Sequence, residues 1–179
     1  MEQNQTIPVI YAGRMSFRNM KGVDIGSLES HSKTIGFLQE IPVFKSMYDC
    51  YYAYSEDGKR IGSLMIVSEA YESEVLNANE PLGEFTVGLS GVVGFFSSPK
   101  TKYSMSQLGD YLRQLEKSHG KNNWVELNTR QFMAPCSQAP ATKVSVYAHR
   151  GRDGEIDAIQ MEFNRKENDI ISQAMKEAE

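Results

Sequence analysis

Two cysteines and three histidines are the side chains of this sequence best suited to nucleophilic chemistry. Cys136 stands in a segment of prolines and small residues, 134–140, which has the composition of a loop. A loop cysteine close to a histidine in space can serve as a nucleophile. Three histidines are candidates for that partner: His31, His119 and His149. No signature of a cysteine-enzyme family surrounds Cys136, so we expect an ordinary thiol there, and Cys50 reads as a small core residue.

His149, Arg150 and Arg152 form a second cluster, beside Asp153-Gly154. Guanidinium groups bind phosphate and carboxylate, which makes Arg150 and Arg152 candidate ligand-binding residues. The interpretation we favour is a solvated hairpin tip. The scattered cysteines and histidines lack the spacing of a zinc site, so we expect neither a metal nor a cofactor.

Glycines recur every third residue at Gly88, Gly91 and Gly94. They match neither the dinucleotide fingerprint nor the phosphate-binding loop, because both need a different spacing at the start of a helix. Within a strand over 84–97 they would create a shallow face, and Gly88 and Gly94 are candidates for lining a small-ligand site there. We favour instead the packing of a helix or an aromatic ring over this face.

Five glutamates lie close together in the sequence and could dock a basic partner or belong to a solvated loop: Glu69, Glu72, Glu74, Glu80 and Glu84. The net charge of −4 argues against nonspecific binding of nucleic acid. The N-terminus has no signal-peptide pattern, and no apolar run reaches the ~18–20 residues that span a bilayer. We therefore expect no membrane segment and, with so few cysteines, a cytoplasmic location.

Two Asp-Gly pairs predict β-hairpins with type I′ turns. Asp57-Gly58 joins strands 48–54 and 61–67, with residue 56 opposite 59. Asp153-Gly154 joins strands 144–150 and 156–163, with residue 152 opposite 155.

The predicted register of the second hairpin decides its faces. It places Val146 opposite Met161 on a buried face, and Arg150 opposite Asp157. Ser145 and Glu162 then face water. The first hairpin, apolar on both faces, should be covered on both sides.

Helices complete the expected fold. An apolar stripe through Leu108, Leu112 and Leu115 predicts a helix over 104–119, and a second helix should begin near Asn168. Segments 7–12 and 124–133 read as strands, and 27–40 could hold a further helix. We predict a single α+β domain over 1–179, with 1–6 disordered. Its mainly antiparallel sheet would have about six or seven strands and two hairpins, packed by the two helices.

The segment 88–96 and the hairpin residues 144–147, 153–156 and Phe163 resemble an uncharacterised bacterial domain-of-unknown-function family. The resemblance covers the C-terminal half and implies an α+β fold without a known activity. Leu89 replaces an acidic residue of that family, and 141–143 replace a Gly-Asp-Gly.

Without a catalytic motif, we expect a non-catalytic, cytoplasmic, bacterial binding or interaction protein whose partner is another protein. An accessory or immunity-like role is consistent with this. One alternative is a hydrolase with a Cys/His nucleophile pair, Cys136 with His149 or another histidine. Another is a small-ligand binder that uses the glycine-lined strand 84–97.

Overall fold

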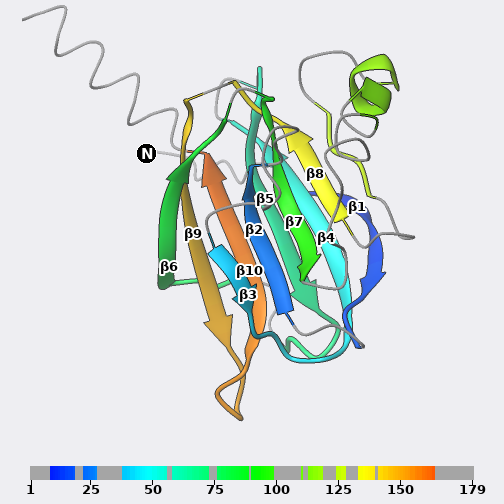
Figure 1. Cartoon of the computed structure of the whole chain (residues 1–179). Helices are drawn as coiled ribbons and strands as arrows, with labels where there is room; N and C mark the ends of the chain where they lie inside the picture. The colour runs from blue at the N-terminus through cyan, green and yellow to red at the C-terminus, as the bar shows by residue number, and fades with distance from the viewer. Residues whose placement is uncertain are drawn as a thin grey trace, which may run out of the picture.

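The computed structural model describes residues 9–18, 22–27, 38–55, 58–72, 76–88, 90–98, 110, 113–118, 124–127, 133–139 and 141–163. Within these residues, ten strands form two antiparallel sheets (Figure 1). The six-stranded sheet has the order β1 (Val9–Ser16), β4 (Met47–Tyr54), β5 (Ile61–Ser68), β10 (Ile156–Phe163), β9 (Lys143–Arg150) and β6 (Glu80–Thr86). The four-stranded sheet has the order β3 (Leu38–Ile41), β2 (Gly22–Ser27), β7 (Val92–Ser98) and β8 (Met133–Ser137).

The core lies between the two sheets, so the fold is a β-sandwich. One buried row crosses the six-stranded sheet through Cys50, Ile66, Ile159 and Ala148, which are paired in that order. The other sheet contributes side chains to the same apolar cluster, among them Ile25, Val93 and Phe95. Direct contact between the sheets also occurs at their margin, where a Cβ atom on Gly83 of β6 would come within 2.9 Å of the Leu38 side chain on β3.

The predicted α+β class is wrong, because the sheets cover each other and are not packed by two helices. The described helical residues are 110 and 113–118, inside the helix expected over 104–119, and Leu115 is buried as its stripe requires. The helix expected from Asn168 lies outside the described residues. Alternating strands with apolar inner faces can bury one another, so the sequence needed no helical layer.

The predicted strand over 84–97 is in fact two strands in different sheets. β6 ends at Thr86 and β7 begins at Val92, and the chain crosses between the sheets in the residues between them. Gly91 has a φ of +70° in this crossover, a conformation that glycine adopts without a steric penalty. A single glycine-lined strand face therefore does not exist: Gly88 lies in the crossover and Gly94 is buried in β7.

Three further strand and helix assignments need correction. Residues 38–40, the end of the segment that could have held a further helix, belong to β3 (Leu38–Ile41). Residues 124–127, expected within a strand, contribute only an isolated bridge from Val125 to Cys136. The supposed loop at Cys136 is strand β8, because the proline and small residues there pair with β7.

The register of the second hairpin is confirmed over most of its length, with Val146 opposite Met161 and both fully buried. Ser145, expected in water, is buried at 4% exposure. A bulge between Ile156 and Ala158 places Arg150 opposite Ile156 rather than Asp157. The turn is not type I′, because Gly154 has a positive φ (+79°) and Asp153 does not.

The first hairpin follows the predicted register only at its tip, where Tyr54 lies opposite Ile61. A bulge then shifts the pairing by one residue, so that Ala53 lies opposite Ser63 and Tyr48 opposite Ser68. Gly62, the residue between, leaves no room for a side chain, because its Cβ would lie 3.0 Å from the Ser55 backbone. The predicted register, with residue 56 opposite 59, would place Met65 and Val67 on the same face as Tyr48; the shift moves them to the opposite face.

Candidate ligand pocket at the β9–β10 turn

The turn between β9 and β10 is a compact loop closed by its own backbone. The Gly151 N–H donates to the Glu155 carbonyl at 2.8 Å, and the Gly154 N–H donates to the Gly151 carbonyl at 3.0 Å. Immediately beyond the turn, the bulge adds Asp157 as an extra residue on β10. A bulge of this kind redirects a side chain, and here it directs Asp157 toward His149.

His149 and Asp157 form a close pair, with His149 Nδ1 2.6 Å from Asp157 Oδ1. The Asp157 side chain is 10% exposed and the His149 side chain 33%. The edge of the Tyr71 ring meets the imidazole, with ring centroids 4.8 Å apart. The histidine ring is therefore held from two sides, by an acceptor at Nδ1 and by an aromatic neighbour.

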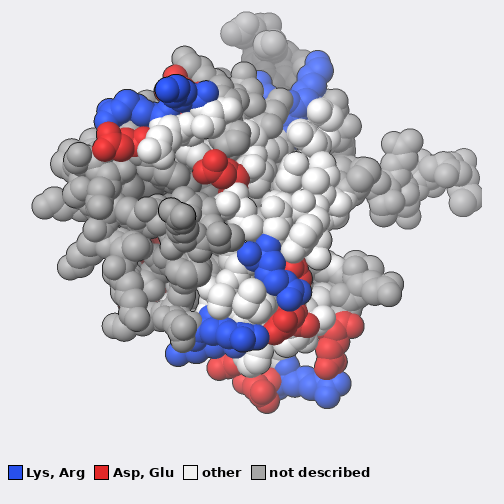
Figure 2. All heavy atoms as spheres, turned by 90° about the vertical axis from the view of Figure 1, so that its right-hand side faces the viewer, with Lys and Arg blue, Asp and Glu red and all other residues white. Residues whose placement is uncertain are grey.

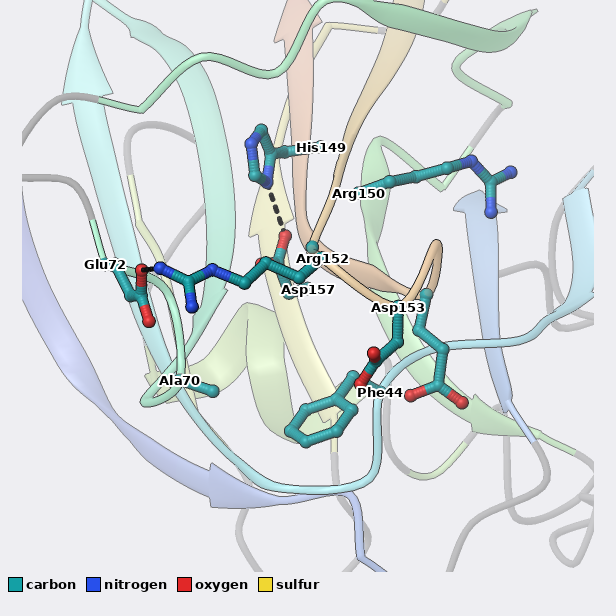
Figure 3. Close-up of a pocket in the computed structure, with 10 residues that line it drawn as sticks. Phe44, Ala70, Glu72, His149, Arg150, Arg152, Asp153 and Asp157 are labelled. Carbon is teal, nitrogen blue, oxygen red and sulfur yellow. Dashed lines mark hydrogen bonds and ion pairs between the residues drawn. The ribbon is translucent and has the colours of Figure 1, made fainter.

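This pair lines a pocket of about 450 Å³ (Figure 3). The pocket is bounded by the turn, by Ala70 and Glu72 after β5, and by Phe44 before β4. Backbone contacts fix Phe44, whose N–H donates to the Ile156 carbonyl at 2.7 Å and whose carbonyl accepts from the Tyr48 hydroxyl at 2.6 Å. The Phe44 ring and several charged side chains thus line the same pocket.

The two arginines of the turn are committed to carboxylates of the protein. Arg152 reaches Glu72 at 3.1 Å across the pocket. Arg150 points away from His149 and binds both oxygens of Glu80 at 3.0 Å. The hydrogen bond to Glu80 also raises the pKa of Arg150. Both guanidinium groups thus already have a carboxylate partner, which weighs against the anion site considered from the sequence.

The pocket carries more negative than positive charge. Four carboxylates line it: Glu72, Asp153, Glu155 and Asp157. Two arginines and one histidine oppose them. Among the contacts of the described residues, the side chains of Asp153 and Glu155 have no hydrogen bond or ion pair. Two carboxylates at the rim therefore remain available to a ligand.

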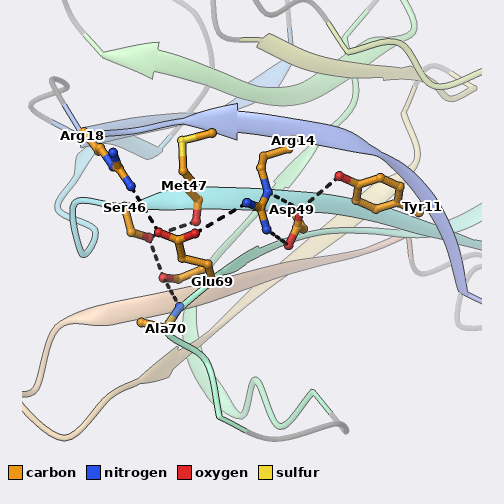
Figure 4. Close-up of polar contacts among 9 residues, drawn as sticks. Tyr11, Arg14, Arg18, Ser46, Met47, Asp49, Glu69 and Ala70 are labelled. Atoms are coloured by element: carbon orange, nitrogen blue, oxygen red, sulfur yellow. Dashed lines mark hydrogen bonds and ion pairs between the residues drawn. The ribbon is translucent and has the colours of Figure 1, made fainter.

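A polar network supports the pocket from the neighbouring strands (Figure 4). Arg14 donates to both oxygens of Asp49, at 2.9 and 3.2 Å. Arg14 and Arg18 both approach Glu69, at 3.5 and 3.3 Å. The Ser68 hydroxyl accepts from the Ala70 N–H at 3.1 Å. This network fixes residues 68–70, from which the chain continues to the pocket residue Glu72.

The network and the histidine lie on one face of the six-stranded sheet. Arg14, Asp49, Val67, Ala158 and His149 are paired in succession across five strands. Three strand spacings separate Asp49 from His149, or roughly 14 Å. Pocket and network are therefore neighbouring features of one outer surface.

The structure does not bring the candidate nucleophile pair together. Cys136 is fully buried in β8, and burial raises the pKa of its thiol above the usual range. His149 is partly exposed and hydrogen-bonds to Asp157. His31 and His119 lie outside the described residues. Within the described part of the chain, no group of three His, Cys, Asp or Glu side chains is placed to hold a metal ion.

Sequence reasoning missed Phe44 and Asp157 as pocket residues, and it missed Tyr71 as the aromatic neighbour of His149. Phe44 lies in a stretch without clear periodicity, and Tyr71 in an acidic loop. Asp157 was assigned to Arg150 because nothing in the sequence marked the bulge. Two signals in the sequence pointed to this place: the Asp-Gly turn, and the cluster of His149, Arg150 and Arg152 beside it.

Oppositely charged groups are intermixed on the face shown in Figure 2, with uncharged surface between the charged clusters. Among the described residues, no helix has the length and apolar character needed to cross a membrane. Fold and pocket together define an antiparallel β-sandwich with a ligand-sized pocket at one hairpin end. Comparisons with protein-family models, curated proteins and solved structures found no match, so the resemblance to a bacterial family stays a prediction.

Proposed function

We propose that this protein is a non-catalytic binding protein and that its pocket receives a basic group, a Lys or Arg side chain, of a protein partner. The observation that carries the proposal is the pair of uncommitted carboxylates, Asp153 and Glu155, at a pocket whose arginines already hold Glu72 and Glu80. An incoming cation would find acceptors there without displacing an internal ion pair.

The shape and the aromatic lining of the pocket support the same ligand class. A volume of about 450 Å³ exceeds what one side chain fills, which leaves room for the adjoining partner backbone. Phe44 offers a ring face, and a guanidinium or ammonium group over such a face gains about 0.5–2 kcal/mol. Electrostatic complementarity of this kind increases the specificity for the partner and the association rate more than it increases the affinity.

The composition of the pocket weighs against catalysis. None of the described residues that line it is a Ser, Thr, Cys or Lys that could act as a nucleophile beside His149. The hydrolase alternative needs Cys136 to be accessible and close to His149. Cys136 is instead buried in the four-stranded sheet, whereas His149 belongs to the six-stranded sheet. An accessory or immunity-like protein would act by binding alone. We keep a bacterial cytoplasm as the proposed setting, because the resemblance is to a bacterial family and both cysteines are free thiols.

The test uses a minimal basic probe, N-acetyl-arginine amide, and a minimal acidic one, N-acetyl-glutamate. Isothermal titration calorimetry and NMR shifts of the Tyr71 and His149 rings should report binding of the basic probe alone. The double variant Asp153→Asn/Glu155→Gln should weaken that binding at least tenfold. The matched control, Glu84→Gln/Glu116→Gln, removes the same charge at exposed positions outside the pocket and should bind like the wild type. Equal binding by both double variants, or a preference for the acidic probe, would contradict the proposal.

A further inference from the structure

A second, smaller pocket lies beside the first one at the β9–β10 turn. It has a volume of about 290 Å³ and is lined by Pro42, Val43, Arg150, Gly154, Glu155 and Ile156. Arg150 and Glu155 also line the first pocket, so the two pockets share a wall. The turn projects beyond the sheets at the lower end of the molecule in Figure 1, where a partner can reach both pockets.

Hydrogen bonds hold the shared wall and the segment that runs along both pockets. The Arg150 Nη1–H group donates to the Gly154 carbonyl at 2.9 Å, across the turn. Below the turn, the Phe44 N–H donates to the Ile156 carbonyl at 2.7 Å. Val43 lines the second pocket and the next residue, Phe44, lines the first. The two pockets are therefore separated by a single step along the chain.

The second pocket differs from the first in its charge. Among the described residues that line it, the charged ones are Arg150 and Glu155, whereas four carboxylates line the first pocket. One charge of each sign gives little attraction for a second basic group. Pro42 is exposed, Val43 is half-buried, and the methylene groups of Arg150 add further apolar surface. An uncharged aliphatic side chain matches this lining.

We propose that the second pocket receives an aliphatic side chain next to the basic residue of the same partner segment. This inference rests on the proposed function, because the basic residue in the first pocket positions the segment. An extended chain advances about 3.3 Å per residue, which suits two pockets that share a wall. The partner class is thereby narrowed from any exposed basic residue to an extended segment with a basic–aliphatic pair.

The test compares dipeptide probes in which the neighbour of the arginine is leucine or glycine. N-acetyl-Arg-Leu-amide and N-acetyl-Leu-Arg-amide cover both chain directions, and the same two peptides with glycine in place of leucine are the matched controls. Isothermal titration calorimetry should show that one leucine probe binds about five- to twentyfold more tightly than its glycine counterpart, because it buries apolar surface. In NMR spectra, all four probes should shift the His149 ring signals, and that leucine probe alone should shift the Val43 methyl signals.

A conservative variant locates the gain in the second pocket. Val43→Thr keeps the shape of the side chain and replaces a methyl group by a hydroxyl. It should reduce the gain from leucine by about threefold and leave binding of the glycine probes unchanged. Val9→Thr makes the same change at an exposed position of β1, outside both pockets, and should bind all four probes like the wild type.

The possible results separate the two pockets. If neither glycine probe binds, the proposed function of the first pocket is wrong, and this inference is overturned with it. If the glycine probes bind and shift the His149 signals but leucine adds nothing, only the second pocket is ruled out. A gain from leucine that persists in Val43→Thr, or that falls equally in Val9→Thr, would also overturn the inference.

Discussion

Asp157 is the residue on which the geometry of the pocket depends most. It is inserted by a bulge, is buried, and forms a hydrogen bond with His149 Nδ1. Asp157→Ala should destabilise the protein by about 1–3 kcal/mol, because it leaves a polar ring nitrogen without its partner in a half-buried site. Asp153→Ala, an exposed change in the same turn, should alter stability by less than about 0.5 kcal/mol. Urea denaturation measures both, and equal effects would show that the pair does not support the turn.

Glu162 gives the fold a dependence on pH. Burial raises the pKa of this carboxyl, so the folded state holds its proton more tightly than the unfolded state. Stability then falls as pH rises from the unfolded pKa through the raised folded one, and is greatest below both. Glu162→Gln should therefore be more stable than the wild type at pH 7, and the gap should close in acid. A gap that is independent of pH between 4 and 7 would contradict this, as thermal melts of both proteins can determine.

The sequence predicted the strand register well in one hairpin and poorly in the other, and the bulges explain much of this difference. Apolar alternation and an Asp-Gly turn correctly placed Val146 opposite Met161. The same signals failed in the first hairpin, because one extra residue at Gly62 shifts every pair beyond it. This bulge depends on the close approach of the backbones of Gly62 and Ser55. The alternation of apolar and polar residues does not indicate such a contact.

The helix is the element whose apolar stripe can be tested directly. Leu115 is buried at 2% exposure, whereas Lys117 is exposed. Leu115→Ala should cost about 2–4 kcal/mol of unfolding free energy, because it leaves a cavity at a buried position. Lys117→Ala should cost almost nothing. Similar midpoints for the two variants in a denaturant melt would mean that the helix does not pack through Leu115.

At the scale of the whole molecule, the sequence failed where distant segments meet. Residues 84–97 alternate as one strand would, yet the chain turns at Gly91 and enters the second sheet. Gln138, the residue after β8, secures that crossover, since its backbone N–H donates to the Gly91 carbonyl at 2.7 Å. The pocket likewise joins residues near 44, 71 and 150. Patterns of neighbouring residues in the sequence predicted a binding role. They do not identify contacts between distant segments, so they could not predict that these segments meet in one pocket.

Charge reversal at the rim tests the central claim, that the pocket selects a basic group, most directly. Asp153→Lys/Glu155→Lys exchanges the two uncommitted carboxylates for ammonium groups at exposed positions, so the fold should persist. NMR titration at low ionic strength should then show that the variant has lost the shifts caused by N-acetyl-arginine amide and gained shifts with N-acetyl-glutamate. Added salt should weaken both interactions, because they are electrostatic and near the surface. An unchanged preference for the basic probe in the reversed protein would contradict the account.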